Sequence, residues 1–76
     1  MHILDQDCEA IINSDNVVGF YMERYEDRGS EFFKIYARAL DGRCIPLGRY
    51  TGRAQTQQIL KEMCNISLGF YFMPKG

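Results

Sequence analysis

The side chains best suited to chemistry are three alternating carboxylates near the start of the chain. Asp5, Asp7 and Glu9 would place three acids along one strand edge, where they could bind a hard cation. The run has no flanking glycine and no glutamate at the offset of a calcium-binding loop. We therefore interpret it as a solvated loop, and we expect no metal ion and no cofactor.

The three cysteines, Cys8, Cys44 and Cys64, do not form a metal-binding pattern either. They are widely spaced, include no Cys-x-x-Cys pair and have one histidine, His2, as a possible companion. This pattern predicts free thiols in buried or half-buried positions. Because the lone histidine lies at the start of the chain, no Ser-His-Asp or Cys-His set can be assembled, and we expect no enzymatic activity.

Length and composition bound the class of protein. Seventy-six residues make a single domain, residues 1–76, without room for a second core. The net charge of −1 gives no global attraction to nucleic acid or to an anionic membrane. No apolar run approaches a membrane span and no signal peptide is recognisable, so we expect a cytoplasmic protein without a membrane partner.

The middle of the chain predicts a three-stranded antiparallel meander over residues 17–26, 32–40 and 43–50. Asp41-Gly42 is a strong hairpin signal, because a tight hairpin turn needs positive φ. A four-residue loop at 27–30 and a two-residue loop at 41–42 set the register of the two hairpins. Both loops place the same residues on one face, which is the predicted core face: Val18, Phe20, Met22, Phe33, Ile35, Ala37, Ala39, Cys44 and Tyr50.

Short elements flank the meander. Residues 2–4 and 10–13 predict two short strands, and residues 70–73 predict a last short strand. An amphipathic helix starts at Arg53, carries an apolar stripe and ends near Asn65 or continues to Gly69. The stripe consists of Thr56, Ile59, Leu60 and Met63. The predicted fold is α+β, an antiparallel sheet of about five strands with one C-terminal helix packed on one face.

The other face of the meander predicts the first candidate functional surface. Its cross-strand rows bring together Tyr21, Tyr36, Ile45 and Leu47, which would form an exposed apolar patch. A patch of this kind favours a protein-interaction module. We expect a protein partner or a second copy of the chain, in a homodimer formed through this face or through an edge strand.

A single-stranded nucleic-acid binder is the alternative interpretation of the same face. Aromatic side chains would stack on bases while cationic side chains contact phosphates. The residues in question are Tyr21, Tyr25, Phe32, Lys34, Tyr36, Arg38 and Arg49. The net acidity and Glu23 in the middle of the patch count against this alternative.

Several short motifs, in their order along the chain, resemble a group of small uncharacterised proteins from Gram-positive bacteria and their phages or integrated elements. The motifs are Ile3-Leu4-Asp5-Gln6-Asp7, Ile11-Ile12-Asn13 followed by Asp15-Asn16-Val17, Leu47-Gly48-Arg49-Tyr50 and Phe72-Met73-Pro74. The typical opening of that group has Ser where this chain has Asp5. The resemblance implies a compact α+β fold and a bacterial or mobile-element origin, and it carries over no activity.

Overall fold

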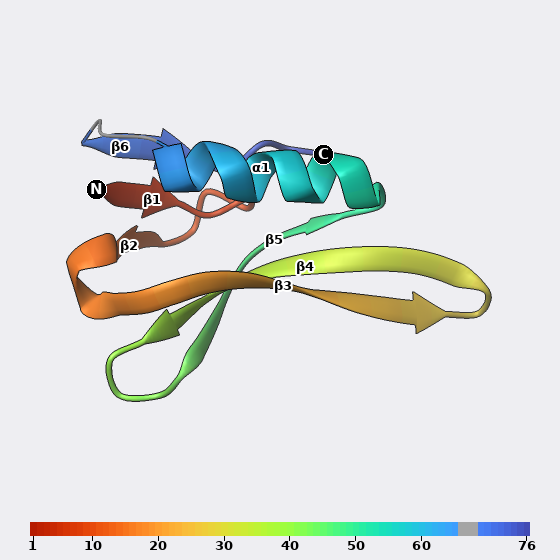
Figure 1. Ribbon diagram of the computed structural model, residues 1–76, viewed down its shortest axis with the longest axis horizontal. Coiled ribbons are helices and arrows are strands. Elements are labelled where there is room, and N and C mark those ends of the chain that lie inside the picture. The colour runs from red at the N-terminus through yellow and green to blue at the C-terminus, as the bar shows by residue number, and fades with distance from the viewer. Residues whose placement is uncertain (66–68) are drawn as a thin grey trace.

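The computed structural model describes residues 1–65 and 69–76, and these form an α+β fold (Figure 1). In chain order the elements are β1 (His2–Leu4), β2 (Ile11–Asn13), the 3-10 helix η1 (Ser14–Asn16), β3 (Val17–Asp27), β4 (Ser30–Ala39), β5 (Cys44–Tyr50), α1 (Arg53–Asn65) and β6 (Phe70–Phe72). The predicted α+β class is confirmed. The predicted single sheet of about five strands is wrong, because the strands form two sheets, ordered β3-β4-β5 and β2-β1-β6.

The long β3–β4 hairpin follows the predicted register over most of its length. Its turn residues Arg28 and Gly29 have φ angles of 51° and 81°. Two successive positive φ values are typical of the tight hairpin turns whose twist matches that of the strands. The loop is shorter than predicted, because residues 27 and 30 pair with each other, but the pairs from Glu26–Glu31 to Phe20–Ala37 are those predicted.

A β-bulge in β5 shifts the second hairpin. Gly48 pairs with Ile35 as predicted, but Pro46 pairs with the next residue of β4, so Leu47 is the extra residue. Beyond the bulge each predicted pair is wrong by one position, and Ile45 lies opposite Ala37. A slip of one residue moves side chains to the other face of a sheet.

The bulges also change which side chains reach the core. Leu47 is 1% exposed, and Ile45 packs against the core, although both were predicted on the open face. Cys44 is exposed instead of buried. A second register shift lies at the start of β3. Val18 was predicted to lie on the core face, but its side chain is 61% exposed. Gly42 lies in the β4–β5 loop with φ of 90°, as predicted.

The small sheet joins the two ends of the chain. β1 pairs antiparallel with β2 and parallel with β6, so the N-terminal strands pair with each other and with the last strand rather than with the meander. Ile3 and Tyr71 lie on the same side of this sheet and are buried. The predicted last strand is present as β6, whereas the predicted alternative of a helix continuing to Gly69 falls mostly outside the described residues.

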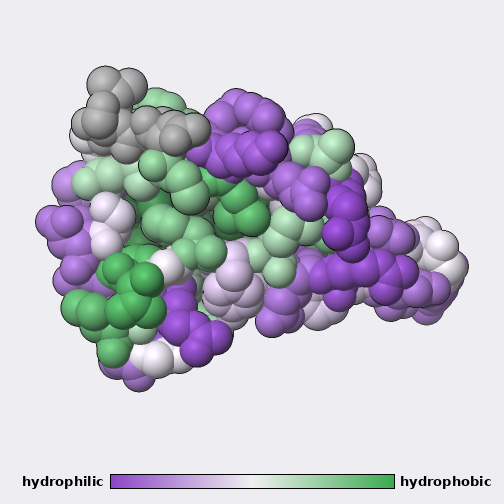
Figure 2. All heavy atoms as spheres, in the orientation of Figure 1, coloured by the Kyte–Doolittle hydropathy of each residue, from purple (hydrophilic) through white to green (hydrophobic). Residues whose placement is uncertain are grey.

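The core lies between α1, the inner face of the large sheet and the small sheet. Helix α1 contacts all three strands of the large sheet. The helix contributes the predicted stripe residues Thr56, Ile59 and Met63, each at most 3% exposed. The remaining buried core residues are Ile3, Phe33, Ile35, Ala37, Ala39, Leu47, Tyr50, Tyr71 and Met73. Figure 2 shows the hydrophilic outer side of α1 and a hydrophobic area over the start of β3 and the β4–β5 loop, where Val18 and Leu40 are exposed.

One side chain covers the outer edge of β5. The Gln6 Oε1 atom accepts a hydrogen bond from the Arg49 backbone N–H at 2.7 Å, and Gln6 Nε2 donates to the Arg49 carbonyl at 3.0 Å. The Gln6 backbone N–H donates to the Leu47 carbonyl at 2.8 Å. Backbone groups at a sheet edge are thereby paired, and the loop between β1 and β2 lies along β5.

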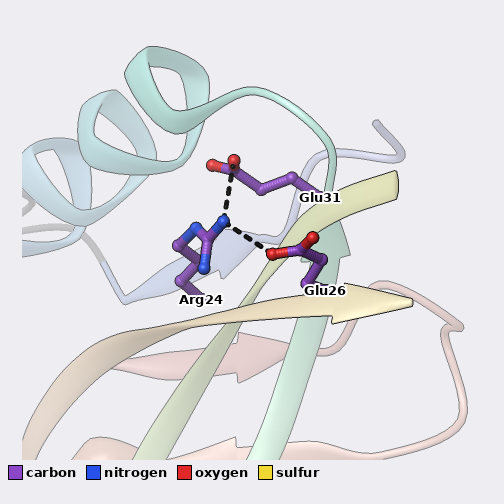
Figure 3. A network of polar contacts seen from close by, with 3 residues as sticks. All are labelled: Arg24, Glu26 and Glu31. Atoms are coloured by element: carbon purple, nitrogen blue, oxygen red, sulfur yellow. Dashed lines mark hydrogen bonds and ion pairs between the residues drawn. The ribbon is translucent and has the colours of Figure 1, made fainter. Parts of the chain in front are cut away.

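The far end of the β3–β4 hairpin extends beyond the helix and is polar on its inner side (Figure 3). Glu26 and Glu31 lie directly opposite each other, which is unfavourable for like charges. The Arg24 Nη2 atom contacts both carboxylates, at 3.1 Å and 3.3 Å, and offsets this repulsion.

In the part of the chain that the structure describes, no helix is long and apolar enough to cross a lipid bilayer.

Candidate functional site

The outer face of the large sheet, opposite α1, gathers every residue of the predicted nucleic-acid set. We call this surface the tyrosine–arginine face, and it consists of Tyr21, Tyr25, Phe32, Lys34, Tyr36, Arg38 and Arg49. The register places these side chains together because they occupy alternate positions of three paired strands. The aromatic residues are half-buried, and Arg38 and Arg49 are exposed.

The predicted apolar patch is not assembled. Tyr21 and Tyr36 lie on the tyrosine–arginine face, as expected. Ile45 and Leu47 lie on the opposite, helix-covered side because of the bulge in β5. A side chain that is 1% exposed, as Leu47 is, cannot contact a partner. This correction removes the apolar half of the first candidate surface.

The first aromatic pair of the face is stacked and covered by a cation. The Tyr21 and Tyr36 rings are stacked, with centroids 5.3 Å apart and an angle of 19° between their planes. The Arg38 guanidinium lies over the Tyr21 ring, 5.5 Å from its centroid. Tyr36 lies opposite Pro46 in the neighbouring strand. Arg38 is therefore in the range of a cation–π interaction, and the Tyr21 ring is covered by Tyr36 and Arg38 of the same chain.

The second aromatic pair carries a cation on each ring. Tyr25 and Phe32 are stacked with centroids 5.3 Å apart and an interplanar angle of 12°. Lys34 Nζ lies 5.3 Å from the Tyr25 centroid, and the Arg49 guanidinium lies 3.9 Å from the Phe32 centroid. Ring edges, hydroxyl groups and the outer sides of the cations are what this face presents to solvent.

A chain of hydrogen bonds links the two aromatic pairs. The Tyr25 hydroxyl donates to Glu23 Oε2 at 2.7 Å, and the hydroxyl oxygens of Tyr25 and Tyr36 are 2.6 Å apart. A phenol has one proton to donate, and the carboxylate can only accept, so Tyr36 must donate to Tyr25. The hydrogen-bonded neighbours Tyr36 and Glu23 raise the pKa of Tyr25, since ionisation would place a phenolate beside the Glu23 carboxylate, and Tyr25 stays protonated across the physiological range.

The tyrosine–arginine face has a positive balance in a chain of net charge −1. It carries the cations Lys34, Arg38 and Arg49, and Glu23 is the carboxylate among them. Glu23 is engaged by the Tyr25 hydroxyl. The face should therefore attract an acidic group on a partner, and the attraction should weaken as salt is added.

A pocket of about 390 Å³ adjoins the face on the β5 side. Lys34 and Arg49 line it together with Asp5 and Asp7. Two carboxylates beside two cations lower the attraction of this end of the face for a polyanion. The Asp5 Oδ1 atom also accepts a hydrogen bond from the Glu9 backbone N–H at 2.9 Å, so this acid stabilises its own loop.

The cysteine prediction is wrong in its burial, because Cys8, Cys44 and Cys64 are all exposed free thiols. Cys8 lies in a turn with φ of 58°, where Lys75 Nζ is 3.1 Å from its sulfur. Cys64 follows the buried stripe residue Met63 and is itself exposed. Among the residues that the structure describes, no three His, Cys, Asp or Glu side chains gather where they could hold a metal ion.

Sequence reasoning missed an apolar surface on the small sheet, the phenylalanine face, which consists of Leu4, Ile11, Phe70 and Phe72. Phe70 is 52% exposed, Phe72 65% and Ile11 60%. The register places Leu4 opposite both Ile11 and Phe72. The sequence around Tyr71 is aromatic at every position, so alternation alone could not separate the buried Tyr71 from its exposed neighbours.

Comparison with known proteins gives no further guide to this site. No family model, no curated protein and no solved structure matches the chain.

Proposed function

We propose that this chain is a non-catalytic protein-interaction module that binds an acidic surface of a partner protein through the tyrosine–arginine face. The observation that carries the proposal is the covered state of the aromatic rings. A base stacks on an open ring surface. Here cations lie over Tyr21, Tyr25 and Phe32, and Tyr36 is stacked on Tyr21. A protein partner can instead use ring edges, hydroxyl groups and guanidinium groups.

The composition of the face also suits a protein partner. Tyrosine and arginine are enriched among the residues that dominate binding energy at protein interfaces. Arg38 and Arg49 are exposed, and Arg49 is supported from below by Phe32. A cation held in place by a ring loses less side-chain freedom on binding than a mobile lysine does. Acidic groups of the partner would bind between these two arginines.

Single-stranded nucleic acid is the competing ligand, because the same seven residues lie on one face. Fluorescence anisotropy with two labelled probes of equal charge distinguishes the two ligands. One probe is a peptide that alternates Glu and Leu, and the other is an oligothymidylate. We expect the peptide to bind, and Arg38→Glu or Arg49→Glu to weaken its binding at least about tenfold, equivalent to ~1.4 kcal/mol.

Lys61→Glu is the matched control. Lys61 is exposed on α1, away from the face, and this substitution changes the net charge as the arginine variants do. It should leave the affinity nearly unchanged. Tighter binding of the oligothymidylate than of the peptide, or an equal loss of affinity in the Lys61 variant, would overturn the proposal. So would a loss of peptide binding in Phe72→Ser with both arginine variants unaffected.

The proposal retains the predictions of a cytoplasmic location and of a bacterial or mobile-element origin. Both rest on the sequence.

A further inference from the structure

We propose that the outer edge of β3 binds a second copy of the chain, forming a continuous antiparallel sheet across a two-fold axis at Met22. This inference goes beyond the acidic partner, because it uses a sheet edge and not the tyrosine–arginine face.

The two edges of the large sheet differ. Gln6 pairs with backbone groups of Arg49 and covers the edge at β5. Among the described residues β3 pairs with β4 alone, as the terminal strand of the order β3-β4-β5. No residue of β3 is buried, although Phe20 and Met22 point toward the core. An edge strand of this length with unpaired backbone groups is a template for another strand.

The hairpin turn determines which backbone groups of β3 are available. Asp27 and Ser30 close the two-residue turn around Arg28 and Gly29, and hydrogen-bonded and non-hydrogen-bonded pairs alternate outward from them. By this alternation the odd-numbered residues of β3 bond to β4. The backbone N–H and C=O groups of the even-numbered residues, with Met22 at the centre of the strand, point away from the sheet.

Charge narrows the register among the two-fold arrangements, and the bulge between Val17 and Gly19 limits pairing about an axis nearer the start of β3. An isologous contact places each group against its counterpart about the axis. An axis at Glu23 or Arg24 would oppose a charge to its own copy, and an axis at Tyr25 would oppose Glu23 to Asp27. An axis at Met22 avoids all three conflicts.

The pairs formed about Met22 are favourable. Arg24 would lie opposite Phe20 of the second copy, in position for a cation–π contact. Glu23 would lie opposite Tyr21, whose hydroxyl can donate to a carboxylate. Gly19 would lie opposite Tyr25, and nothing lies within 4 Å of a Cβ built on Gly19, so the ring of the second copy has open space to cover. The pairing ends at Gly19, where the bulge of β3 begins.

Disulfide trapping tests this register in a background with the three exposed cysteines replaced by serine. Facing Cα atoms in such a pair are about 4.5–5.5 Å apart, within the ~4.4–6.8 Å that a disulfide spans. Met22→Cys should cross-link to itself on mild oxidation. A mixture of Tyr21→Cys and Glu23→Cys should form the mixed dimer, while each of these variants alone stays uncross-linked.

Phe20→Cys is the matched control, because its counterpart in this register is Arg24 and not Phe20. Sedimentation equilibrium of the unmodified chain should give twice the monomer mass at high micromolar concentration. A monomeric mass at that concentration, or Phe20→Cys cross-linking as readily as Met22→Cys, would overturn the dimer or its register. The outer-face variants at positions 21 and 23 keep the test decisive if Met22→Cys is poorly folded. None of these outcomes depends on binding of the acidic peptide.

Discussion

The close approach of Tyr50 to Gly48 predicts a large cost for adding one methyl group. A Cβ at position 48 would lie 2.7 Å from the Tyr50 hydroxyl oxygen, 2.9 Å from Cε2 and 3.0 Å from Cζ. Tyr50 is 1% exposed, and its hydroxyl donates to the Pro74 carbonyl at 2.7 Å, so the ring is held in place. Gly48→Ala must therefore displace a packed ring or bend the strand.

The magnitude follows from two opposing effects. Overpacking a core costs roughly 1–3 kcal/mol, and loss of the hydrogen bond from Tyr50 to Pro74 adds about 0.5–1.5 kcal/mol if the ring moves. Replacing glycine in a strand returns roughly 0.5–1 kcal/mol of backbone entropy. We expect Gly48→Ala to lower the free energy of unfolding by about 1–3 kcal/mol, measured by urea denaturation followed by circular dichroism.

Two comparisons isolate the contact. Gly19→Ala, where an added Cβ meets nothing within 4 Å, should be neutral or slightly stabilising at concentrations where the chain is monomeric. In a Tyr50→Leu background the ring is gone, so Gly48→Ala should cost at least about 1 kcal/mol less than in the parent chain. Equal costs in both backgrounds, or a Gly48→Ala variant as stable as the parent, would refute the steric argument.

Three further predictions concern stability. Burial raises the pKa of Tyr50 from its ordinary value near 10 to about 12. Because the unfolded chain loses this proton first, the contribution to stability is fully present below pH 10 and falls between pH 10 and 12. Tyr50→Phe should reduce that fall in a pH series of denaturation curves. Gln6→Ala should lower the free energy of unfolding by roughly 0.5–1.5 kcal/mol and speed amide exchange at Arg49, because the backbone groups of this sheet edge lose their partner; an unchanged exchange rate would contradict this role. Ile35→Ala, at a fully buried position, should cost roughly 2–5 kcal/mol in the same denaturation assay, and a loss below about 1 kcal/mol would be inconsistent with the observed core.

The β3–β4 register could be predicted because it depends on local information. Alternating side chains and one turn determine it, and the two sources agree. The bulge at Leu47 could not be predicted from alternation, since an extra residue in a strand resets the pattern. Pro46 was the available signal: proline has no backbone N–H and, within sheets, occurs at edges and bulges.

The candidate site was predicted correctly where the strand register was correct, and incorrectly beyond the bulge. The aromatic residues of the tyrosine–arginine face are on β3 and β4, where the register was correct, and so they were placed together. Ile45 and Leu47 are on β5 at and beyond the bulge, so their side chains lie in or against the core and not on the predicted outer face. The small sheet depends on pairing β1 with β6 across most of the chain, and no local pattern specifies such a contact.

The two proposals make a joint prediction about affinity. Pairing at β3 would place two tyrosine–arginine faces side by side on one sheet, because the face begins at the strand that forms the contact. An acidic peptide long enough to reach both faces would then bind a dimer more tightly than a monomer, since its second contact is intramolecular. A short peptide that reaches one face would bind both forms equally. Anisotropy titrations of oxidised and reduced Met22→Cys with the two peptides measure this difference, and an equal gain for both peptides would show that dimerisation changes the face itself rather than joining two copies of it.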